Sequence, residues 1–123
     1  MIKTKCIKDP IEPSDGIRIS VMSSHTIDGI IPDTEITENM YDLHIPELAA
    51  PTKLLGDYYK RGLSWSEYET RYLEHIRTLD IKLLILDLIK KYDIITFLCI
   101  ESDDSKCHRR LLQEECIKMI DQL

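Results

Sequence analysis

The chain has 123 residues, and 16 Lys and Arg against 22 Asp and Glu give it a formal net charge of -6 at pH 7. This length fits one domain with a sizeable core. The negative charge gives no overall attraction for nucleic acid or an anionic membrane surface, and we expect neither as a partner. Because no apolar run is long enough to span a bilayer and no secretion signal is evident, we expect a cytoplasmic protein.

The amino-terminal part of the chain predicts two strands and a long loop. Residues 1–8 alternate in polarity, which is typical of a strand. A turn at Asp15 and Gly16 precedes Ile17–Met22, where the alternation gives the second strand one fully apolar face. Residues 23–39 follow neither a helical nor a strand period, and a loop of this length is often a functional element.

The middle of the chain predicts helices. Residues 40–48 are ambiguous and are compatible with a short extended piece. Pro51 suits the first turn of a helix that runs to about Lys60 and ends at Gly62. Ser64, followed three residues later by a glutamate, forms a capping box that predicts a second helix over residues 65–78.

An aromatic stripe follows one face of this second helix. It contains Trp65, Tyr68 and Tyr72, and Ile76 continues it. Such a stripe could stack on bases, but no lysines are interleaved with it and the net charge is negative. The stripe therefore predicts a helix that faces the core.

The carboxyl-terminal third predicts a helix, a strand and a helix. Residues 80–92 are apolar around most of the helical circumference, as for an element packed on a sheet. Residues 94–100 form an apolar run rich in branched side chains, typical of a central strand covered on both faces. Residues 107–123 predict an amphipathic helix with its apolar side, which includes Ile120 and Leu123, turned inward. We expect a single α/β domain with a small, at least partly parallel sheet of three to four strands covered by four helices.

The candidate site lies between this last strand and the last helix. Glu101 ends the apolar run, and Cys107, His108 and Arg109 stand at the start of the helix. Residues beyond the carboxyl ends of adjacent parallel strands converge on one edge of a sheet, so His25, after the second strand, is expected nearby. Unpaired amides at a helix amino terminus favour an anion and favour thiolate over thiol. We therefore expect an open, electropositive site with an accessible sulfur.

These residue types predict a nucleophilic thiol with a base. Cys107 is the candidate nucleophile, and Glu101 or His25 is the candidate proton-transfer partner. Consecutive helical residues diverge by about 100°, so His108 is poorly placed to pair with Cys107 unless the backbone there is irregular.

The basic residues predict a small anionic ligand. Arg18 and Arg109, together with His108, would bind a phosphate or a carboxylate. Arg18 has a second interpretation, in which it pairs with a carboxylate such as Asp15 or Glu101 inside the protein. The two interpretations stay open at this point.

Enzymatic activity also stays open. In the alternative, the domain is a non-catalytic module that binds a nucleotide, a phosphometabolite or a protein partner, and Cys107 only packs at the helix start. Free thiols are expected in a reducing compartment. No cofactor is expected, and zinc is disfavoured because Cys99 falls inside a predicted strand and no short ligand pair is present. No oligomeric state is predicted.

Several segments resemble the family of domain of unknown function 488, which includes the YeaO-like proteins. The site segment carries Leu98, Cys99, Ile100, Glu101, Asp103, Cys107, His108 and Arg109. Earlier matches are Lys5, Asp9, Pro10, Ser14, Asp15, Gly16 and Arg18, then Glu47, Leu48, Ala49, Pro51 and Leu54, then Trp65, Tyr68, Arg71, Tyr72 and Leu73. At Met22–Thr26 the chain departs from the YeaO-like pattern, so no role is transferred there. The resemblance implies an α/β fold and no established activity.

Overall fold

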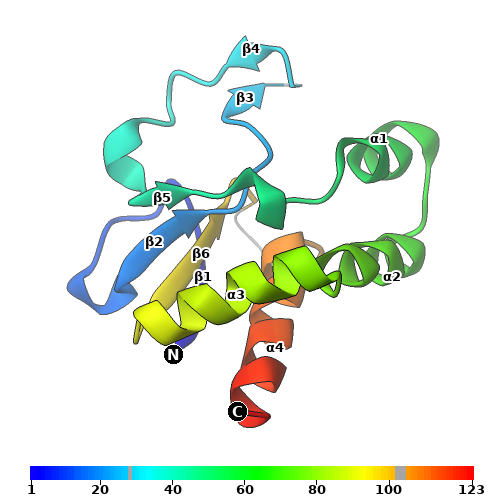
Figure 1. The fold of residues 1–123 in the computed structure, drawn as a ribbon. Coiled ribbons are helices and arrows are strands. Elements are labelled where there is room, and N and C mark those ends of the chain that lie inside the picture. The colour runs from blue at the N-terminus through cyan, green and yellow to red at the C-terminus, as the bar shows by residue number, and fades with distance from the viewer. Residues whose placement is uncertain (28, 102–104) are drawn as a thin grey trace.

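The structure is a sheet of four parallel strands with four α-helices (Figure 1). It is a computed structural model, and it describes residues 1–27, 29–101 and 105–123. The strands of the sheet, in spatial order, are β1 (Ile2–Cys6), β6 (Ile95–Cys99), β2 (Ile17–Ser20) and β5 (Leu43–His44). The helices are α1 (Thr52–Arg61), α2 (Trp65–Ile76), α3 (Leu79–Lys91) and α4 (His108–Asp121). The predicted α/β class, parallel pairing and number of helices are confirmed.

The central strand is β6, as the apolar run predicts. It pairs in parallel with β1 on one side and β2 on the other, and all five of its residues are buried. Alternate side chains point to opposite faces, so Phe97 joins the helix-packed core while Leu98 belongs to a second cluster. Burial on both faces accounts for an apolar run without an amphipathic period.

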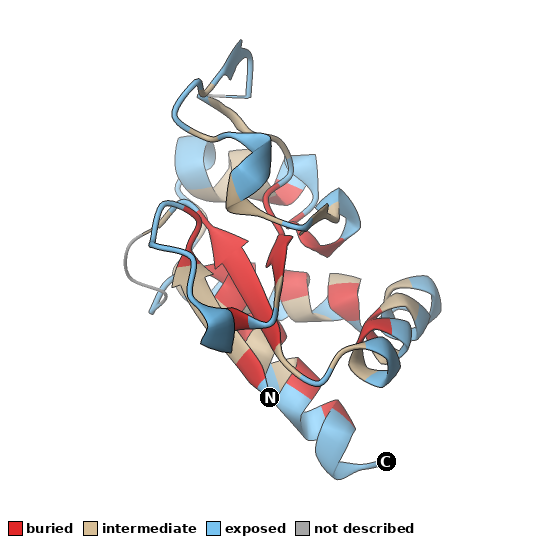
Figure 2. Ribbon diagram, turned by 90° about the vertical axis from the view of Figure 1, so that its left-hand side faces the viewer, coloured by how far each residue is buried: buried red, intermediate tan, exposed pale blue. Residues whose placement is uncertain are grey.

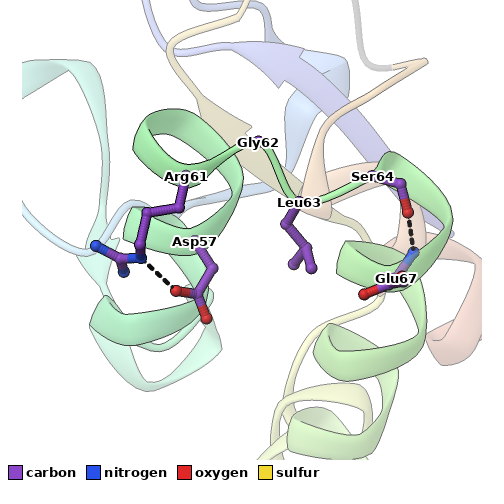
Figure 3. Close-up of a pocket in the computed structure, with 6 residues that line it drawn as sticks. All are labelled: Asp57, Arg61, Gly62, Leu63, Ser64 and Glu67. Atoms are coloured by element: carbon purple, nitrogen blue, oxygen red, sulfur yellow. Dashed lines mark hydrogen bonds and ion pairs between the residues drawn. The ribbon is translucent and has the colours of Figure 1, made fainter.

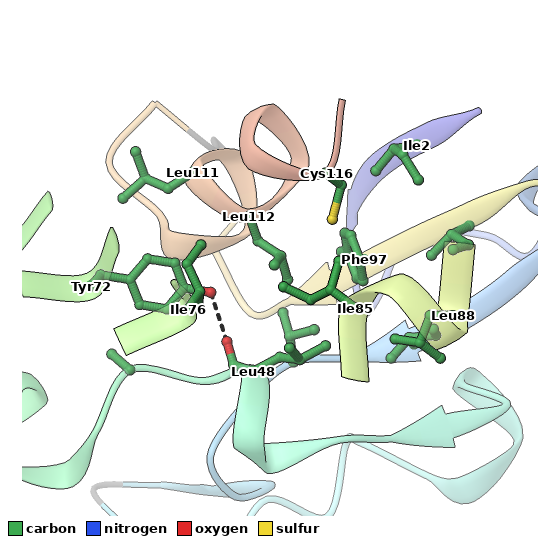
Figure 4. Packing of buried hydrophobic residues seen from close by; sticks show 14 of the residues in the cluster. Ile2, Leu48, Tyr72, Ile76, Ile85, Leu88, Phe97, Leu111, Leu112 and Cys116 are labelled. Carbon is green, nitrogen blue, oxygen red and sulfur yellow. Dashed lines mark hydrogen bonds between the residues drawn. The ribbon is translucent and has the colours of Figure 1, made fainter. Parts of the chain in front are cut away.

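The helices pack against one face of the sheet. Phe97 and Ile19 from this face share one cluster with Leu54 of α1, Ile85 of α3 and Leu112 of α4. Figure 4 shows side chains of α3 and α4 gathered around the strand, and Figure 2 shows the buried positions concentrated in the sheet and on the adjoining helix faces. Ile19 and Val21 are fully buried, which confirms the predicted apolar face of the second strand.

Local signals set the helix boundaries. The Ser64 hydroxyl accepts a hydrogen bond from the amide of Glu67 at 3.2 Å, so the predicted cap begins α2. Gly62 ends α1 in the left-handed conformation, with φ at 75°. Tyr68 and Tyr72 are buried, which confirms that the aromatic stripe faces the core.

Three sequence expectations need correction. Residues 23–39 contain a short antiparallel pair, β3 (Thr26–Ile27) with β4 (Ile31–Pro32), and a 3-10 turn at Glu38–Met40. Ile120 is 37% exposed rather than inward, because Met119 takes the inward position and the next side chain turns by about 100°. Leu123 lies past the helix end and is exposed.

A further correction concerns α3. Ile85 and Leu88 are its buried residues, whereas Leu79 and Leu83 are more than half exposed. One stripe of α3 therefore packs, although most of its circumference is apolar. None of the described helices has the length and apolar character needed to cross a membrane.

Candidate functional site

Two thiols and one carboxylate meet at the carboxyl end of the central strand. Cys99 is the last residue of β6, and Cys107 is the amino-terminal cap of α4, with an extended backbone. The Sγ atom of Cys99 lies 2.9 Å from Oε2 of Glu101, and the Sγ atom of Cys107 lies 3.4 Å from the same oxygen. Both sulfurs therefore lie within hydrogen-bond distance of one carboxylate oxygen.

His108 completes this cluster, and the condition stated above for its pairing with Cys107, an irregular backbone at that position, is met. Its Nδ1 atom lies 4.0 Å from Sγ of Cys107, and its Nε2 atom lies 2.8 Å from the carbonyl oxygen of Val21. The two side chains approach because Cys107 has an extended rather than a helical backbone. A carbonyl oxygen only accepts, so Nε2 carries the proton and the lone pair of Nδ1 in the neutral ring faces the sulfur.

The cluster polarises its members. A hydrogen bond with Cys99 and the neighbouring His108 lower the pKa of the Cys107 thiol to about 6, although burial and Glu101 act in the opposite direction. The pKa of Cys99 is raised by its hydrogen bond with Cys107 and by burial. Burial acts to lower the pKa of His108, but Cys107 outweighs it and the net shift is upward.

The carboxylate is held in its charged form. Burial acts to raise the pKa of Glu101, but hydrogen bonds from Cys99 and the Tyr59 hydroxyl outweigh it, and the pKa is lowered. The Tyr59 hydroxyl donates to Oε1 of Glu101 at 3.1 Å. Sequence reasoning missed Tyr59, because it lies on α1 and no local pattern links it to a residue 42 positions away.

Arg109 is a buried cation beside this cluster. It is 2% exposed, and its Nη1 atom donates to the carbonyl oxygen of Glu101 at 2.5 Å. Its Nε atom is buried and has no hydrogen-bond partner among the described residues. Among the described residues, no carboxylate lies within ion-pair distance of this guanidinium. A buried positive charge in this state favours a nearby anion.

Arg18 forms an internal ion pair, which is the second of the two interpretations given for it. Its Nη1 atom contacts Oδ2 of Asp15 at 2.7 Å, and its Nε atom donates to the carbonyl oxygen of Met40 at 2.9 Å. Its Nη2 atom lies near the carbonyl oxygens of Ile7 and Asp9. These partners occupy the guanidinium, so the structure pairs Arg18 internally rather than presenting it to the thiols.

The described contacts of His25 do not include Cys107. Its Nε2 atom is 2.7 Å from the hydroxyl of Ser20, and its ring packs on His44 and Tyr41. Ser20 alternates with Ile19 along β2 and therefore points away from the helix-covered face. A role for His25 beside Cys107 stays a prediction.

The open site that the sequence suggests is not what the structure shows. Cys107 is 3% exposed and Cys99 5% exposed, so both sulfurs lie in buried residues. A surface pocket exists elsewhere, between the end of α1 and the start of α2 (Figure 3). It is lined by Asp57, Arg61, Gly62, Leu63, Ser64 and Glu67. Asp57 is already paired with Arg61 at 2.6 Å, and Ser64 caps α2, so these two polar side chains of the pocket are engaged within the protein.

The cluster also has the donor types of a metal site. One ligand atom each from Cys99, Cys107 and His108 lie within 4.8 Å of one another. Cys99 lies in a strand, as predicted, but at its last position, from which its sulfur reaches the other two donor atoms. Cys116 is separate and packs in the main core near Ile2 (Figure 4).

The comparisons identify the family. A family model described as the active DUF488-N3 subclade matches residues 2–119, which is nearly the whole chain. No curated protein and no solved structure matches the chain. Asp103 of the signature quoted above lies outside the described residues, whereas its cysteines, His108 and Arg109 form the cluster around Glu101. The chain belongs to the DUF488 family, in the subclade described as active.

Proposed function

We propose that the protein acts on a small anionic electrophile, with Cys107 as the nucleophile and Arg109 as the anion-binding residue. The observation that carries this proposal is the contact of a thiol at the amino terminus of α4 with an imidazole and a carboxylate, next to a buried guanidinium that donates to the carbonyl oxygen of Glu101. Each group is of a type that covalent catalysis by cysteine uses. The substrate class would be a phosphate-bearing or carboxylate-bearing compound.

Arg109 supports the choice of an anion. Its side chain is buried, and its Nε atom has no hydrogen-bond partner in the described part of the chain. An oxyanion at this guanidinium would satisfy both the hydrogen bond and the charge. Because Arg109 and Cys107 lie in the same first turn of α4, the helix dipole would add to the attraction.

Two groups in contact with Cys107 would handle protons. Glu101 lies 3.4 Å from its sulfur and His108 lies 4.0 Å from it. In the proposed step Nδ1 of His108 accepts the proton of the Cys107 thiol, the resulting thiolate forms a bond to the electrophilic atom, and the bond from that atom to its leaving group breaks. The leaving group takes a proton from the His108 imidazolium. His25 has no part in this step, since its described contacts are with Ser20, His44 and Tyr41.

Alkylation with a matched pair of reagents tests the proposal. Iodoacetate is a small anionic electrophile, and iodoacetamide is its neutral counterpart. With chelator present at pH 7, we expect Cys107 to react faster than Cys116, which is fully buried and whose pKa burial raises to about 12. Replacing Arg109 with Met should lower the iodoacetate rate more than the iodoacetamide rate. Mass spectrometry of the digested protein identifies the modified cysteine.

Two outcomes would contradict the proposal. If Cys107 reacts no faster than Cys116 or Cys6, it is not an activated nucleophile. If the ratio of iodoacetate to iodoacetamide rates is the same in wild type and Arg109→Met, Arg109 does not recruit the anion. An unreactive Cys107, together with sulfate binding that depends on Arg109, would instead support the non-catalytic binding module.

A further inference from the structure

The donor atoms of Cys99, Cys107 and His108 have the spacing of a tetrahedral metal site. The sulfur of Cys107 and Nδ1 of His108 are 4.0 Å apart, and all three donor atoms lie within 4.8 Å of one another. Zinc bonds of about 2.0 to 2.3 Å at tetrahedral angles place ligand atoms roughly 3.5 to 3.8 Å apart. Small side-chain adjustments would therefore bring these atoms to bonding distance of one ion.

His108 is oriented as metal-binding histidines are. Its Nε2–H donates to the carbonyl oxygen of Val21 at 2.8 Å, which leaves Nδ1 as the acceptor. A backbone carbonyl in this position fixes the tautomer and the ring orientation of a metal ligand. The ring also packs edge-on against Tyr72, with 5.4 Å between ring centroids.

Glu101 is the candidate for a fourth donor because it contacts both sulfurs, although the group of donor atoms within 4.8 Å of one another consists of Cys99, Cys107 and His108 only. Its Oε2 atom lies 2.9 Å from the sulfur of Cys99 and 3.4 Å from that of Cys107. The set is then two thiolates, one imidazole nitrogen and one carboxylate oxygen. Sulfur and imidazole donors favour zinc over magnesium or calcium, which prefer all-oxygen sites. A divalent ion would also neutralise the negative charges that these buried groups carry as ligands.

We propose that Cys99, Cys107, His108 and Glu101 form a zinc-binding site at the carboxyl end of β6. This inference goes beyond the proposed function and does not depend on it. Zinc would occupy the sulfur of Cys107, so the metal-bound and alkylation-competent forms exclude each other. Cys116 and Cys6 are not part of the proposed site, so substitutions at these cysteines serve as matched controls.

Cobalt titration tests the site directly. Metal-free protein, prepared with a chelator and a reductant, is titrated with Co²⁺ and then with Zn²⁺. We expect one equivalent of Co²⁺ to produce sulfur-to-cobalt charge-transfer absorption and the visible bands of a tetrahedral ion, and Zn²⁺ to abolish both. Cys99→Ser and His108→Gln should weaken binding by more than the 10–100-fold typical of second-shell losses. Cys116→Ser should bind as the wild type does.

The variant Glu101→Gln tests the contribution of the fourth ligand while the other three ligands stay in place. We expect this variant to retain charge-transfer absorption from both thiolates, with weaker binding and altered visible bands. Far-UV circular dichroism and a thermal melt confirm that each variant is folded. One equivalent of Zn²⁺ should also protect Cys107 of the wild type from iodoacetamide.

The proposal of a metal site is contradicted if folded wild-type protein shows no charge-transfer absorption with Co²⁺. It also fails if Cys99→Ser and Cys116→Ser bind the ion equally well. Alkylation of metal-free protein is measured separately, so a reactive Cys107 without metal binding would overturn the zinc site and leave the proposed function standing. Metal binding together with an unreactive Cys107 would support the zinc site and contradict the proposed function.

Discussion

The Nε2–H of His108 donates to the carbonyl oxygen of Val21 across 2.8 Å, which ties the first turn of α4 to the chain just beyond β2. This bond joins residues 87 positions apart. It sets which ring nitrogen faces the sulfur of Cys107. The relative position of helix and sheet thus depends on the same side chain that polarises the thiol.

His108→Leu should therefore destabilise the fold. The substitution leaves the buried Val21 carbonyl without this donor, and an unpaired buried group of this kind costs about 1 to 3 kcal/mol. Urea unfolding measures the loss. His75 makes the same type of bond, from Nε2 to the carbonyl of Glu47, but at an exposed position. His75→Leu should change stability by less than about 0.5 kcal/mol, and equal losses in the two variants would contradict the role given to burial.

Sequence patterns specify the central strand and the helices because these features are local. The apolar run around Phe97 indicates a strand that is buried on both faces. Ser64 marks the start of α2, and Gly62 marks the end of α1. The short strand β5 has no such signal, since it contributes Leu43 and His44 and pairs only at the edge of the sheet.

The site is predicted in part, for a physical reason. Cys107, Glu101 and His108 lie close together in sequence, and the junction of β6 and α4 brings them into contact. Tyr59 and the Val21 carbonyl belong to distant segments of the chain, and His25 contacts Ser20 through a hydrogen bond that no local pattern indicates. Those relationships come from tertiary packing, which local periodicity does not encode.

Asp15 should give the protein a pH-dependent contribution to stability in acid. It is 1% exposed; burial acts to raise its pKa, but bonds from the Glu12 amide, Arg18 and Lys5 outweigh it and lower the pKa from 3.8 to about 2. Since the unfolded state binds the proton more tightly, this contribution is fully present above pH 3.8 and is lost as the pH falls through about 2. It amounts to at most about 2 kcal/mol.

Urea unfolding of wild type and Asp15→Asn between pH 2 and pH 5 measures this effect. The difference in unfolding free energy between the two proteins should shrink as the pH falls. Asp121→Asn, at an exposed position, serves as the control and should follow the wild type throughout. A difference between wild type and Asp15→Asn that stays constant with pH would count against the role of the Asp15 charge.

Gly16 should tolerate no side chain. Its φ is 63°, and an added Cβ would lie 2.2 Å from the carbonyl oxygen of Ile94, which is backbone and cannot rotate away. Gly29 has a similar φ of 76° but open space where its Cβ would be. Gly29→Ala should cost about 1 kcal/mol for backbone strain alone, whereas Gly16→Ala should cost several times more. Similar melting temperatures for the two variants would show that the collision with Ile94 is relieved.

Arg109 should couple anion binding to stability. If sulfate binds the folded protein at this guanidinium, a concentration ten times the dissociation constant stabilises the fold by about 1.4 kcal/mol. Sulfate also stabilises proteins in general by exclusion from their surface. The neighbouring Arg110 separates the two effects, because it is partly exposed and already paired with Glu114 at 2.9 Å.

Arg109→Met and Arg110→Met should therefore respond differently to sulfate in thermal melts. We expect wild type and Arg110→Met to gain the specific and the general stabilisation, and Arg109→Met to retain only the general part. Arg109→Met also removes a buried charge whose Nε atom has no partner, so its loss of stability without sulfate should be smaller than for a paired buried arginine. Arg18→Met supplies that comparison, because it leaves the buried Asp15 without its 2.7 Å partner. Equal sulfate responses in Arg109→Met and Arg110→Met would show that Arg109 is a structural cation rather than an anion-binding residue.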